Sequence, residues 1–270
     1  MKGIKVGDYY LGKEDGLFLI GGPCLIEDRG TFMLDIAREI RDLCRKLSIP
    51  FIFKSSYEKA NRSHIDSETG PGIERGLEIL AQVKEELGVP ILCDVHSEAE
   101  VEKASKVADI LQIPAFLCRQ TRLILAVAKS QRVVNVKKGQ FLSPEGMKNI
   151  VEKIQSTGND SILLTERGSC FGYHNLVVDM RSFPIMAELG YPVVFDGTHS
   201  VQLPSSGKET GGERKFIRPL VKAATAAGID GLFLEIHPRP ELAPCDSSNM
   251  LPLAELESLL RTALAIKEAI

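Results

Sequence analysis

The sequence predicts an α/β protein that folds as a single (β/α)8 TIM barrel. Short apolar, β-branched segments recur along the chain, and a helical pattern follows each one. Each apolar segment ends in a polar residue, as expected where the carboxyl ends of parallel strands carry an active site. The length of 270 residues matches one such barrel, which typically has about 250 residues. We therefore expect one domain over residues 1–270.

The expected elements alternate along the chain. Strands are expected at residues 17–21, 51–53, 91–93, 109–111, 133–136, 162–165, 193–195 and 231–234. Helices are expected at residues 30–47, 72–87, 97–106, 119–129, 144–156, 179–189, 213–227 and 252–269. Two short apolar segments around Gly7-Asp8 predict an N-terminal β-hairpin over about residues 4–12, at the bottom of the barrel. Long loops at 197–212 and 237–252 are expected at the top, where such loops often bind ligands.

Composition and charge give no support for several classes of partner. The formal net charge is −3, which predicts neither nucleic-acid nor membrane-surface binding. The sequence has no apolar run of about 18 residues, the length that would indicate a membrane span. Residues 1–5 lack the apolar stretch of a signal peptide, so we expect a cytoplasmic protein. The six cysteines form no CxxC pair and are expected to be free thiols.

Cationic residues follow four of the expected strands. They are Lys54, Lys59 and Arg62 after the second strand, Arg119 after the fourth, Lys137 and Lys138 after the fifth, and Arg167 after the sixth. In a closed barrel these side chains converge on one rim. Such a cluster on an otherwise mildly acidic chain predicts binding of more than one phosphate or carboxylate group. The alternative is a set of solvated surface charges.

A possible metal site comes from strand ends one, seven and eight, which are neighbours in a closed barrel. Its candidate ligands are Cys24, His199, Glu235 and Asp246. One thiolate, one imidazole and two carboxylates suit Zn²⁺, Fe²⁺, Mn²⁺ or Co²⁺ better than Ca²⁺. These residues are scattered in the sequence, so the alternative is a buried cysteine, a structural histidine and two rim carboxylates.

Uncharged and acidic polar residues also stand at strand ends three, four and seven. Asp94 and His96 follow the third expected strand, Gln112 the fourth and Asp196 the seventh. A carboxylate or imidazole at such a position can orient a hydroxyl or move a proton. The sequence assigns no specific role to Asp196.

Longer segments resemble the 3-deoxy-D-manno-octulosonate-8-phosphate synthase family. The matching segments are Gly21-Gly-Pro-Cys24, Phe51-Ile-Phe-Lys-Ser-Ser-Tyr-Glu-Lys-Ala-Asn-Arg-Ser63, Gln112-Ile-Pro-Ala-Phe-Leu-Cys-Arg-Gln120, Asn135-Val-Lys-Lys-Gly-Gln-Phe141, Thr165-Glu-Arg-Gly168, Phe171-Gly-Tyr173, Asp196-Gly-Thr-His-Ser-Val-Gln-Leu-Pro204 and Glu235-Ile-His-Pro238. The resemblance runs from Leu17 to the end of the chain. The related 3-deoxy-arabino-heptulosonate-7-phosphate synthases share the barrel and the phosphoenolpyruvate end, but residues 59–63 look like the octulosonate branch.

The resemblance implies an enzyme that condenses phosphoenolpyruvate with D-arabinose 5-phosphate and water. The products would be 3-deoxy-D-manno-octulosonate 8-phosphate, a lipopolysaccharide precursor, and inorganic phosphate. The runner-up is the heptulosonate synthase, which acts on erythrose 4-phosphate. A third reading is a catalytically silent barrel that binds a sugar phosphate, but no matched position lacks its cation or ligand.

The resemblance also implies roles for individual residues. Lys137 and Arg167 would hold the phosphate of phosphoenolpyruvate, while Lys54 and Lys59, helped by Gln112, would contact its carboxylate end. Asn61, Arg62 and Ser63 would bind the pentose phosphate, Asp94 a pentose hydroxyl, and Ser55 would also line the substrate site. The catalytic residues would be Lys59, Asn61, Asp94 and His199. Arg119 would reach the pentose phosphate of a neighbouring subunit, which implies a homotetramer.

Position 24 divides this family into two branches. One branch has Asn there and needs no metal, whereas the other has Cys and uses a divalent metal. This chain has Cys24, and His199, Glu235 and Asp246 match the other ligands. The resemblance therefore implies a metal-dependent enzyme whose ion is Zn, Fe, Mn or Co. A second thiol, Cys245, stands beside Asp246 in the sequence.

Overall fold

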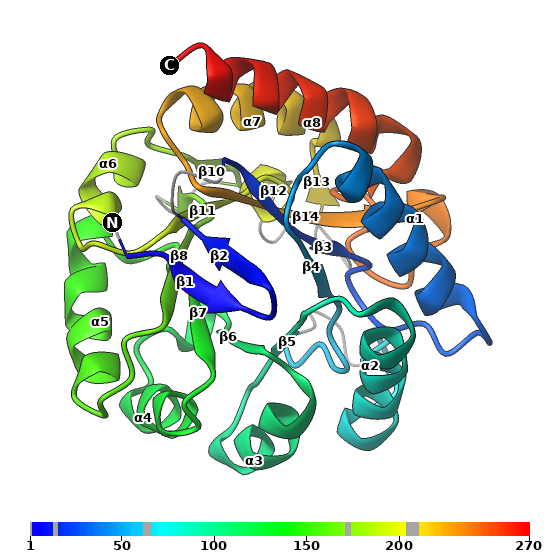
Figure 1. Cartoon of the computed structure of the whole chain (residues 1–270), viewed down its shortest axis with the longest axis horizontal. Helices are drawn as coiled ribbons and strands as arrows, with labels where there is room; N and C mark the ends of the chain where they lie inside the picture. Colours follow the sequence, from blue (N-terminus) through cyan, green and yellow to red (C-terminus); the bar gives the residue numbers. More distant parts are fainter. Residues whose placement is uncertain (1, 13–15, 62–65, 171–173, 204–210) are drawn as a thin grey trace.

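In a computed structural model, the chain forms a closed barrel of parallel strands surrounded by helices (Figure 1). The barrel strands are β3 (Phe18–Gly22), β4 (Phe51–Lys54), β5 (Ile91–Asp94), β6 (Ile110–Ile113), β7 (Val133–Lys137), β8 (Ile162–Glu166), β11 (Val193–Asp196) and β14 (Gly231–His237). Each pairs with the next in chain order, and β14 pairs with β3 to close the ring. The predicted TIM barrel is confirmed. The structure describes residues 2–12, 16–61, 66–170, 174–203 and 211–270.

Helices follow the barrel strands and cover the outside of the barrel. They are α1 (Phe32–Lys46), α2 (Ile73–Leu87), α3 (Glu98–Val107), α4 (Thr121–Lys129), α5 (Met147–Gln155), α6 (Ser182–Ala187), α7 (Ile217–Ala226) and α8 (Leu253–Glu268). The helix expected at 179–189 is shorter than predicted, because residues 179–181 form a turn in which Asp179 accepts the backbone N–H of Arg181. None of the helices in the described ranges is both long and apolar enough to cross a membrane.

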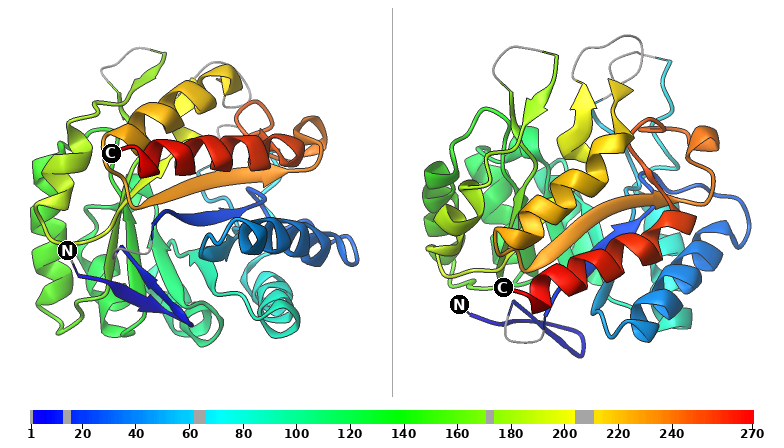
Figure 2. Two further views of the ribbon diagram at one scale, coloured as in Figure 1. Left: turned by 45° about the horizontal axis from the view of Figure 1, so that its top comes forward. Right: turned by 90° about the horizontal axis from the view of Figure 1, so that it is seen from above.

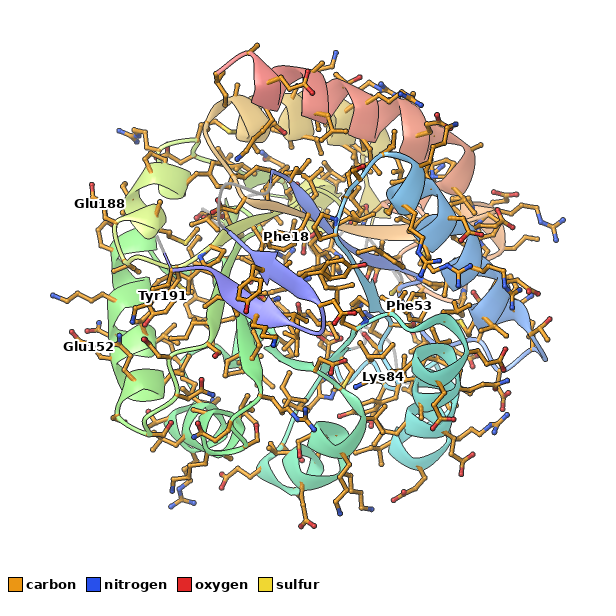
Figure 3. All side chains as sticks on the ribbon, viewed as in Figure 1. Phe18, Phe53, Lys84, Glu152, Glu188 and Tyr191 are labelled. Atoms are coloured by element: carbon orange, nitrogen blue, oxygen red, sulfur yellow. The ribbon has the colours of Figure 1, made fainter. Side chains whose placement is uncertain are left out.

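Packing explains why these segments adopt these elements. All residues of the eight barrel strands are buried, as expected for a parallel sheet that is covered on both faces. Each helix turns an apolar face inward, so that Leu80 and Val83 of α2 are buried. Figure 3 shows Phe18 and Phe53 inside the molecule, while Glu152 and Glu188 project from the outer helices.

The predicted hairpin closes the amino-terminal end of the barrel. It consists of β1 (Ile4–Val6) and β2 (Tyr9–Leu11), which pair antiparallel, and it crosses the barrel mouth in Figure 1. Ile4, Val6 and Leu11 are buried. A Cβ added at Gly12 would come within 2.3 Å of Pro192, just before β11, so this end of the barrel is tightly packed.

Shorter elements gather at the opposite, carboxyl-terminal end (Figure 2). They are the pairs β9 (Ser169–Cys170) with β10 (Leu176–Val177) and β12 (Gln202–Leu203) with β13 (Gly211–Gly212), the strand β15 (Leu251–Pro252), and the 3-10 turns η1 (Ala115–Leu117), η2 (Pro144–Gly146), η3 (His199–Val201), η4 (Arg214–Phe216) and η5 (Pro240–Leu242). The long loops predicted at 197–212 and 237–252 carry several of these elements, although residues 204–210 lie outside the described ranges.

Candidate active site

A cavity of about 330 Å³ opens at the carboxyl-terminal end of the barrel. This volume is within the range of small-molecule sites. The residues that line it include most of those predicted from the sequence, namely Lys54, Lys59, Asn61, Asp94, Gln112, Lys137, Arg167, His199 and Asp246. The strand ends therefore bring together side chains that are up to about two hundred residues apart in the chain, as the barrel topology requires.

Arg167, just after β8, provides one fixed positive charge. Its Nη2 donates to the backbone oxygen of His199 (3.0 Å) and to Oε1 of Gln202 (2.7 Å). Its Nε is buried and has no hydrogen-bond partner among the described residues. Burial lowers the pKa of Arg167, and neighbouring carboxylates, Asp196 first, oppose that effect. A buried guanidinium with an unused donor is suited to hold an anion.

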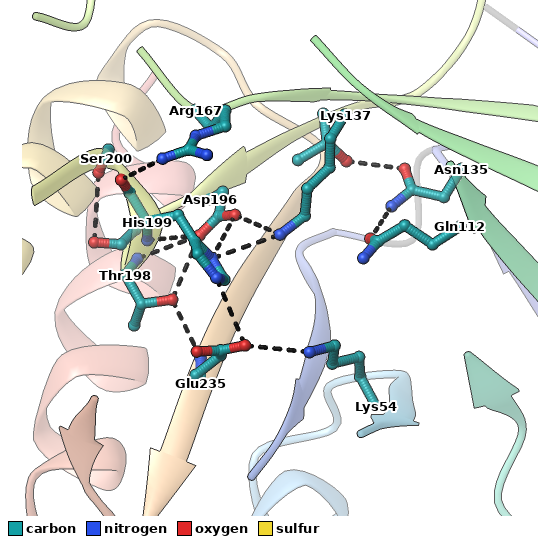
Figure 4. A network of polar contacts seen from close by, with 12 residues as sticks. Lys54, Gln112, Asn135, Lys137, Arg167, Asp196, Thr198, His199, Ser200 and Glu235 are labelled. Atoms are coloured by element: carbon teal, nitrogen blue, oxygen red, sulfur yellow. Dashed lines mark hydrogen bonds and ion pairs between the residues drawn. The ribbon is translucent and has the colours of Figure 1, made fainter. Parts of the chain in front are cut away.

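Lys137, at the end of β7, is paired with Asp196 at the end of β11 (Figure 4). Its Nζ lies 2.6 Å from Oδ2 of Asp196 and 3.6 Å from the centre of the Phe233 ring. Burial lowers the pKa of Lys137, while the Asp196 carboxylate counteracts this. The positive charge is thus held in place by a carboxylate on one side and an aromatic face on another.

Asp196 connects this lysine to the candidate metal ligand His199. It is fully buried, and Oδ1 accepts the backbone N–H groups of Thr198 and His199. Oδ2 lies 2.8 Å from Nδ1 of His199. Burial would raise the pKa of Asp196, but His199 and Lys137 outweigh it and lower that pKa far below the usual range. Asp196, to which the sequence assigned no role, is therefore a charged residue that orients two others.

The same contact defines which nitrogen of His199 can bind a metal. A proton on Nδ1 satisfies the Asp196 carboxylate, which leaves the lone pair on Nε2 available. Nε2 lies 3.4 Å from Oε1 of Glu235, so it points toward another predicted ligand. A carboxylate that fixes the imidazole in this way is a common arrangement behind metal-binding histidines.

Glu235, in β14, stands between the lysines and the histidine. Its Oε1 lies 3.0 Å from Nζ of Lys54 and 3.4 Å from Nζ of Lys59. Burial opposes ionisation, but His199 and the two lysines lower the pKa of Glu235 well below its usual value. Its Oε2 is buried and finds no hydrogen-bond partner in the part of the chain that the structure describes. This oxygen is therefore free to accept a further partner, such as a cation.

The four predicted metal ligands belong to two groups of donor atoms that share Asp246, and one of these groups also contains Cys245, which was not predicted as a ligand. His199, Glu235 and Asp246 form one group, and Cys24, Cys245 and Asp246 form the other; within each group the donor atoms lie within 4.8 Å of one another. Cys24 Sγ donates to Oδ2 of Asp246 at 3.0 Å. Asp246 has a φ of 49°, in a left-handed region that residues other than Gly, Asn and Asp rarely adopt. This donor set and the unpaired oxygen of Glu235 fit a divalent ion.

A hydrogen-bonded ladder fixes the polar floor of the cavity across four strands. Gln112 donates to Asp94, Asn135 donates to Oε1 of Gln112 (2.7 Å), and Thr165 donates to Asn135 (2.7 Å). The nitrogen of the Gln112 side-chain amide donates to Asp94 and its oxygen accepts from Asn135, so these two neighbours determine the orientation of the amide. Asn135 and Thr165 belong to segments that carry the family resemblance, but their part in the site was not predicted.

Comparison with known proteins agrees with this geometry. A sequence model described as "DAHP synthetase I family" matches residues 3–270. The chain belongs to the DAHP synthetase I family. A protein of Trichlorobacter lovleyi named "2-dehydro-3-deoxyphosphooctonate aldolase" is 54% identical over 266 residues, covering 98% of this chain and 97% of that protein. Proteins of the same name from Geotalea uraniireducens (54% identical, 98% of each chain) and a Synechococcus strain (53% identical, 98% of this chain and 94% of that one) are also similar.

Some predicted residues of this family member lie away from the cavity. Arg119 is exposed between η1 and α4 and is not among the residues that line the cavity. Ser55 is buried below the surface, with no hydrogen-bond partner for its Oγ among the described residues. Arg62 and Ser63, like the Phe171-Gly-Tyr173 segment, lie outside the described residues.

Other lining residues were not predicted as site residues. Gln140 and Gln202 face the cavity, and Gln202 joins Arg167 to Asp246, since its Nε2 donates to Oδ1 of Asp246 at 3.2 Å. Both glutamines fall within segments that carry the family resemblance. His96, which the sequence placed among the polar residues that follow the third strand, does line the cavity, and its Nδ1 lies 3.3 Å from Glu100.

Proposed function

We propose that this protein condenses phosphoenolpyruvate with D-arabinose 5-phosphate and water to give 3-deoxy-D-manno-octulosonate 8-phosphate and inorganic phosphate. Such a product is a precursor of lipopolysaccharide. The observation that carries the proposal is the set of four buried or nearly buried cations, Lys54, Lys59, Lys137 and Arg167, around one cavity. The names of relatives at 52–54% identity favour the octulosonate product over the heptulosonate product.

The reaction makes two bonds and breaks one. C3 of phosphoenolpyruvate forms a bond to the aldehyde carbon of the pentose, and the oxygen of water forms a bond to C2. The bond between C2 and the phosphate oxygen then breaks, and inorganic phosphate leaves. Water gives up both of its protons as C2 becomes a ketone: one is balanced by the proton that the aldehyde oxygen takes up to become a hydroxyl, and the other leaves with the phosphate. Buried cations aimed at the departing phosphate stabilise its negative charge without a cost for reorganising solvent.

We assign phosphoenolpyruvate to the side of the cavity that Lys137 and Arg167 form. Lys137 and the unused Nε donor of Arg167 suit its phosphate. Lys54 and Lys59, which both face Glu235, would hold the carboxylate end with Gln112. Lys59 suits a substrate-binding position because its amine stays charged: burial lowers its pKa, but nearby anionic groups such as the Glu235 carboxylate, 3.4 Å away, raise it overall.

We assign the pentose phosphate to the outer part of the cavity. Asn61 lines the cavity next to Lys59, and Arg62 and Ser63 follow it in the sequence. Asp94 would hold a pentose hydroxyl, since it is ionised: burial opposes this, but Lys54 and Lys59 lower its pKa. Arg119, which is exposed on this chain, would complete the phosphate site of a neighbouring subunit in a homotetramer.

We also propose a divalent metal ion, Zn, Fe, Mn or Co, held by Cys24, His199, Glu235 and Asp246. When bound, such an ion supplies Lewis-acid chemistry, which polarises an aldehyde oxygen or activates water. His199 is prepared for this role by Asp196, which occupies its other nitrogen. We further propose a cytoplasmic location, a prediction supported by six cysteines that are all free thiols.

Release of inorganic phosphate tests the proposed reaction. Phosphoenolpyruvate is mixed with the protein and either arabinose 5-phosphate or erythrose 4-phosphate, in the presence of added metal. We expect phosphate release with the arabinose compound and little with the erythrose compound. The opposite preference would identify a heptulosonate synthase, and no release with either sugar would indicate a protein that only binds sugar phosphates.

Metal dependence is tested separately from substrate preference. The protein is stripped with a chelator, and its metal content is measured before the phosphate assay. We expect activity to be lost and then restored by Zn²⁺, Mn²⁺ or Co²⁺. Full activity of a protein shown to be metal-free would contradict the metal assignment while leaving the proposed reaction intact.

A further inference from the structure

The cysteine next to Asp246 is part of the candidate metal centre as well as of the loop after β14. Cys245 packs in a small buried cluster with Cys24, Leu25 and Met250. The Sγ atoms of Cys24 and Cys245 and a carboxylate oxygen of Asp246 lie within 4.8 Å of one another. Two sulfurs therefore stand side by side at the edge of the site, although the sequence predicted only Cys24 as a ligand.

This upper limit of 4.8 Å on the separation of the two sulfurs is compatible with their binding a single ion. A Zn–S bond is about 2.3 Å long, so two sulfurs on one zinc ion are at most about 4.6 Å apart. Cys24 also contacts Asp246, which belongs to both groups of donors. Both sulfurs therefore lie close enough together to bind one ion with Asp246.

A buried thiol elsewhere in the described residues, Cys44, has different surroundings. Cys44 lies on the inner face of α1 in the main hydrophobic core, and burial alone raises its pKa to about 12. Cys24 and Cys245 instead belong to a group that includes a carboxylate. Packing alone explains a thiol such as Cys44, but it does not explain two thiols that converge on a shared carboxylate.

We propose that Cys245 supplies a second thiolate to the metal centre, so that this chain binds a thiophilic divalent ion through both Cys24 and Cys245. The inference rests on the metal site proposed above and adds one ligand to it. Each sulfur–metal bond replaces an S–H bond, and the proton leaves to the solvent. Because thiolates favour Zn²⁺ over the harder Mn²⁺, the second thiolate makes the site selective for zinc.

X-ray absorption spectroscopy of the zinc-loaded protein counts the sulfur ligands directly. We expect two sulfurs at about 2.3 Å in the unaltered protein. Cys24→Ser and Cys245→Ser are each expected to leave one sulfur. Cys44→Ser is the matched control, because it also removes a buried thiol, and it is expected to leave two. The count in the unaltered protein decides the question even if a variant does not fold.

The possible results separate this inference from the proposed metal site. One sulfur in the unaltered protein that is lost in Cys24→Ser but kept in Cys245→Ser would overturn the inference and leave the four proposed ligands intact. One sulfur that is lost only in Cys245→Ser would overturn the assignment of Cys24. No sulfur at all would overturn both.

Competition between two metal ions gives a second readout that does not depend on activity. The metal-free protein is equilibrated with a mixture of Zn²⁺ and Mn²⁺, and the bound metals are measured. We expect the preference for zinc to fall at least about tenfold in Cys245→Ser and to stay unchanged in Cys44→Ser. An unchanged preference in Cys245→Ser would contradict the second thiolate.

Discussion

The two ends of this barrel bury different kinds of side chain. At the amino-terminal end, the hairpin covers the barrel with buried apolar side chains such as Ile4, Val6 and Leu11. At the carboxyl-terminal end, ionised groups such as Lys137 and Asp196 are buried within hydrogen-bond distance of one another. Replacing buried ion pairs by apolar residues often leaves stability unchanged or increases it. The comparison teaches that the first end maintains the fold, whereas the second retains charges that the fold does not need.

Replacing Arg167 is expected to have the largest effect on catalysis. Arg167→Met removes a buried cation that is assigned to the phosphate of phosphoenolpyruvate. We expect kcat for phosphate release to fall roughly 10²- to 10³-fold, as when a preorganised charge-stabilising donor is lost. Steady-state phosphate assays, run at a temperature where thermal unfolding shows the variant to be folded, measure this. Arg181→Met, at an exposed position, is the control, and an equal fall in both variants would contradict the assignment.

Replacing Leu11 is expected to lower stability and to leave catalysis unchanged. Leu11→Ala truncates a side chain of the hairpin itself that is 1% exposed. We expect the free energy of unfolding to fall by about 2–5 kcal/mol, measured by denaturant titration, with kcat unchanged at a temperature where the variant is folded. Leu242→Ala, at a half-exposed position, should change stability little. A large loss of kcat in folded Leu11→Ala would remove the distinction between the two ends.

Neutralising Asp196 tests whether this residue connects Lys137 to the candidate metal ligand His199. Asp196→Asn keeps the shape but weakens the contacts with Lys137 and His199. We expect metal affinity to fall roughly 10- to 100-fold, as when a residue behind a metal-binding histidine is lost. Metal titration of the stripped protein measures this. Unchanged affinity would mean that Asp196 does not position His199.

Much of this comparison could be predicted from the sequence, because strand ends in a barrel all point to one rim. Lys54, Lys137 and Arg167 follow apolar strands directly, and their meeting in one cavity is confirmed. The role of Asp196 could not be predicted, since it depends on contacts with side chains from β7 and η3. The proximity of Cys24 and Cys245 depends likewise on how a loop packs, which no periodicity encodes.

The pH dependence of stability gives the smallest effect, in the network beside the cavity. Burial would raise the pKa of Glu100, but hydrogen bonds from His96, Ser97 and Tyr57 lower it from 4.5 to about 2. The unfolded chain therefore binds the proton more readily, and stability is lost as the pH falls from about 4.5 toward 2.

Thermal unfolding across this pH range tests the prediction. We expect Glu100→Gln to lose less stability than the unaltered protein as the pH falls from about 4.5 to 2. Glu102→Gln, whose side chain is exposed and pairs with the exposed Lys106, is the control and should follow the unaltered protein. Identical curves for all three proteins would mean that Glu100 is not held in its ionised form by this network.

A crystal structure with phosphoenolpyruvate bound tests most directly the claim that the charges of the carboxyl-terminal end form the substrate site. The account predicts the phosphate against Lys137 and Arg167, with the carboxylate toward Lys54 and Lys59. A phosphoenolpyruvate molecule found instead only on the outer surface, for example at the groove that Arg214, Lys215 and Arg218 line, with the barrel cavity empty, would contradict it.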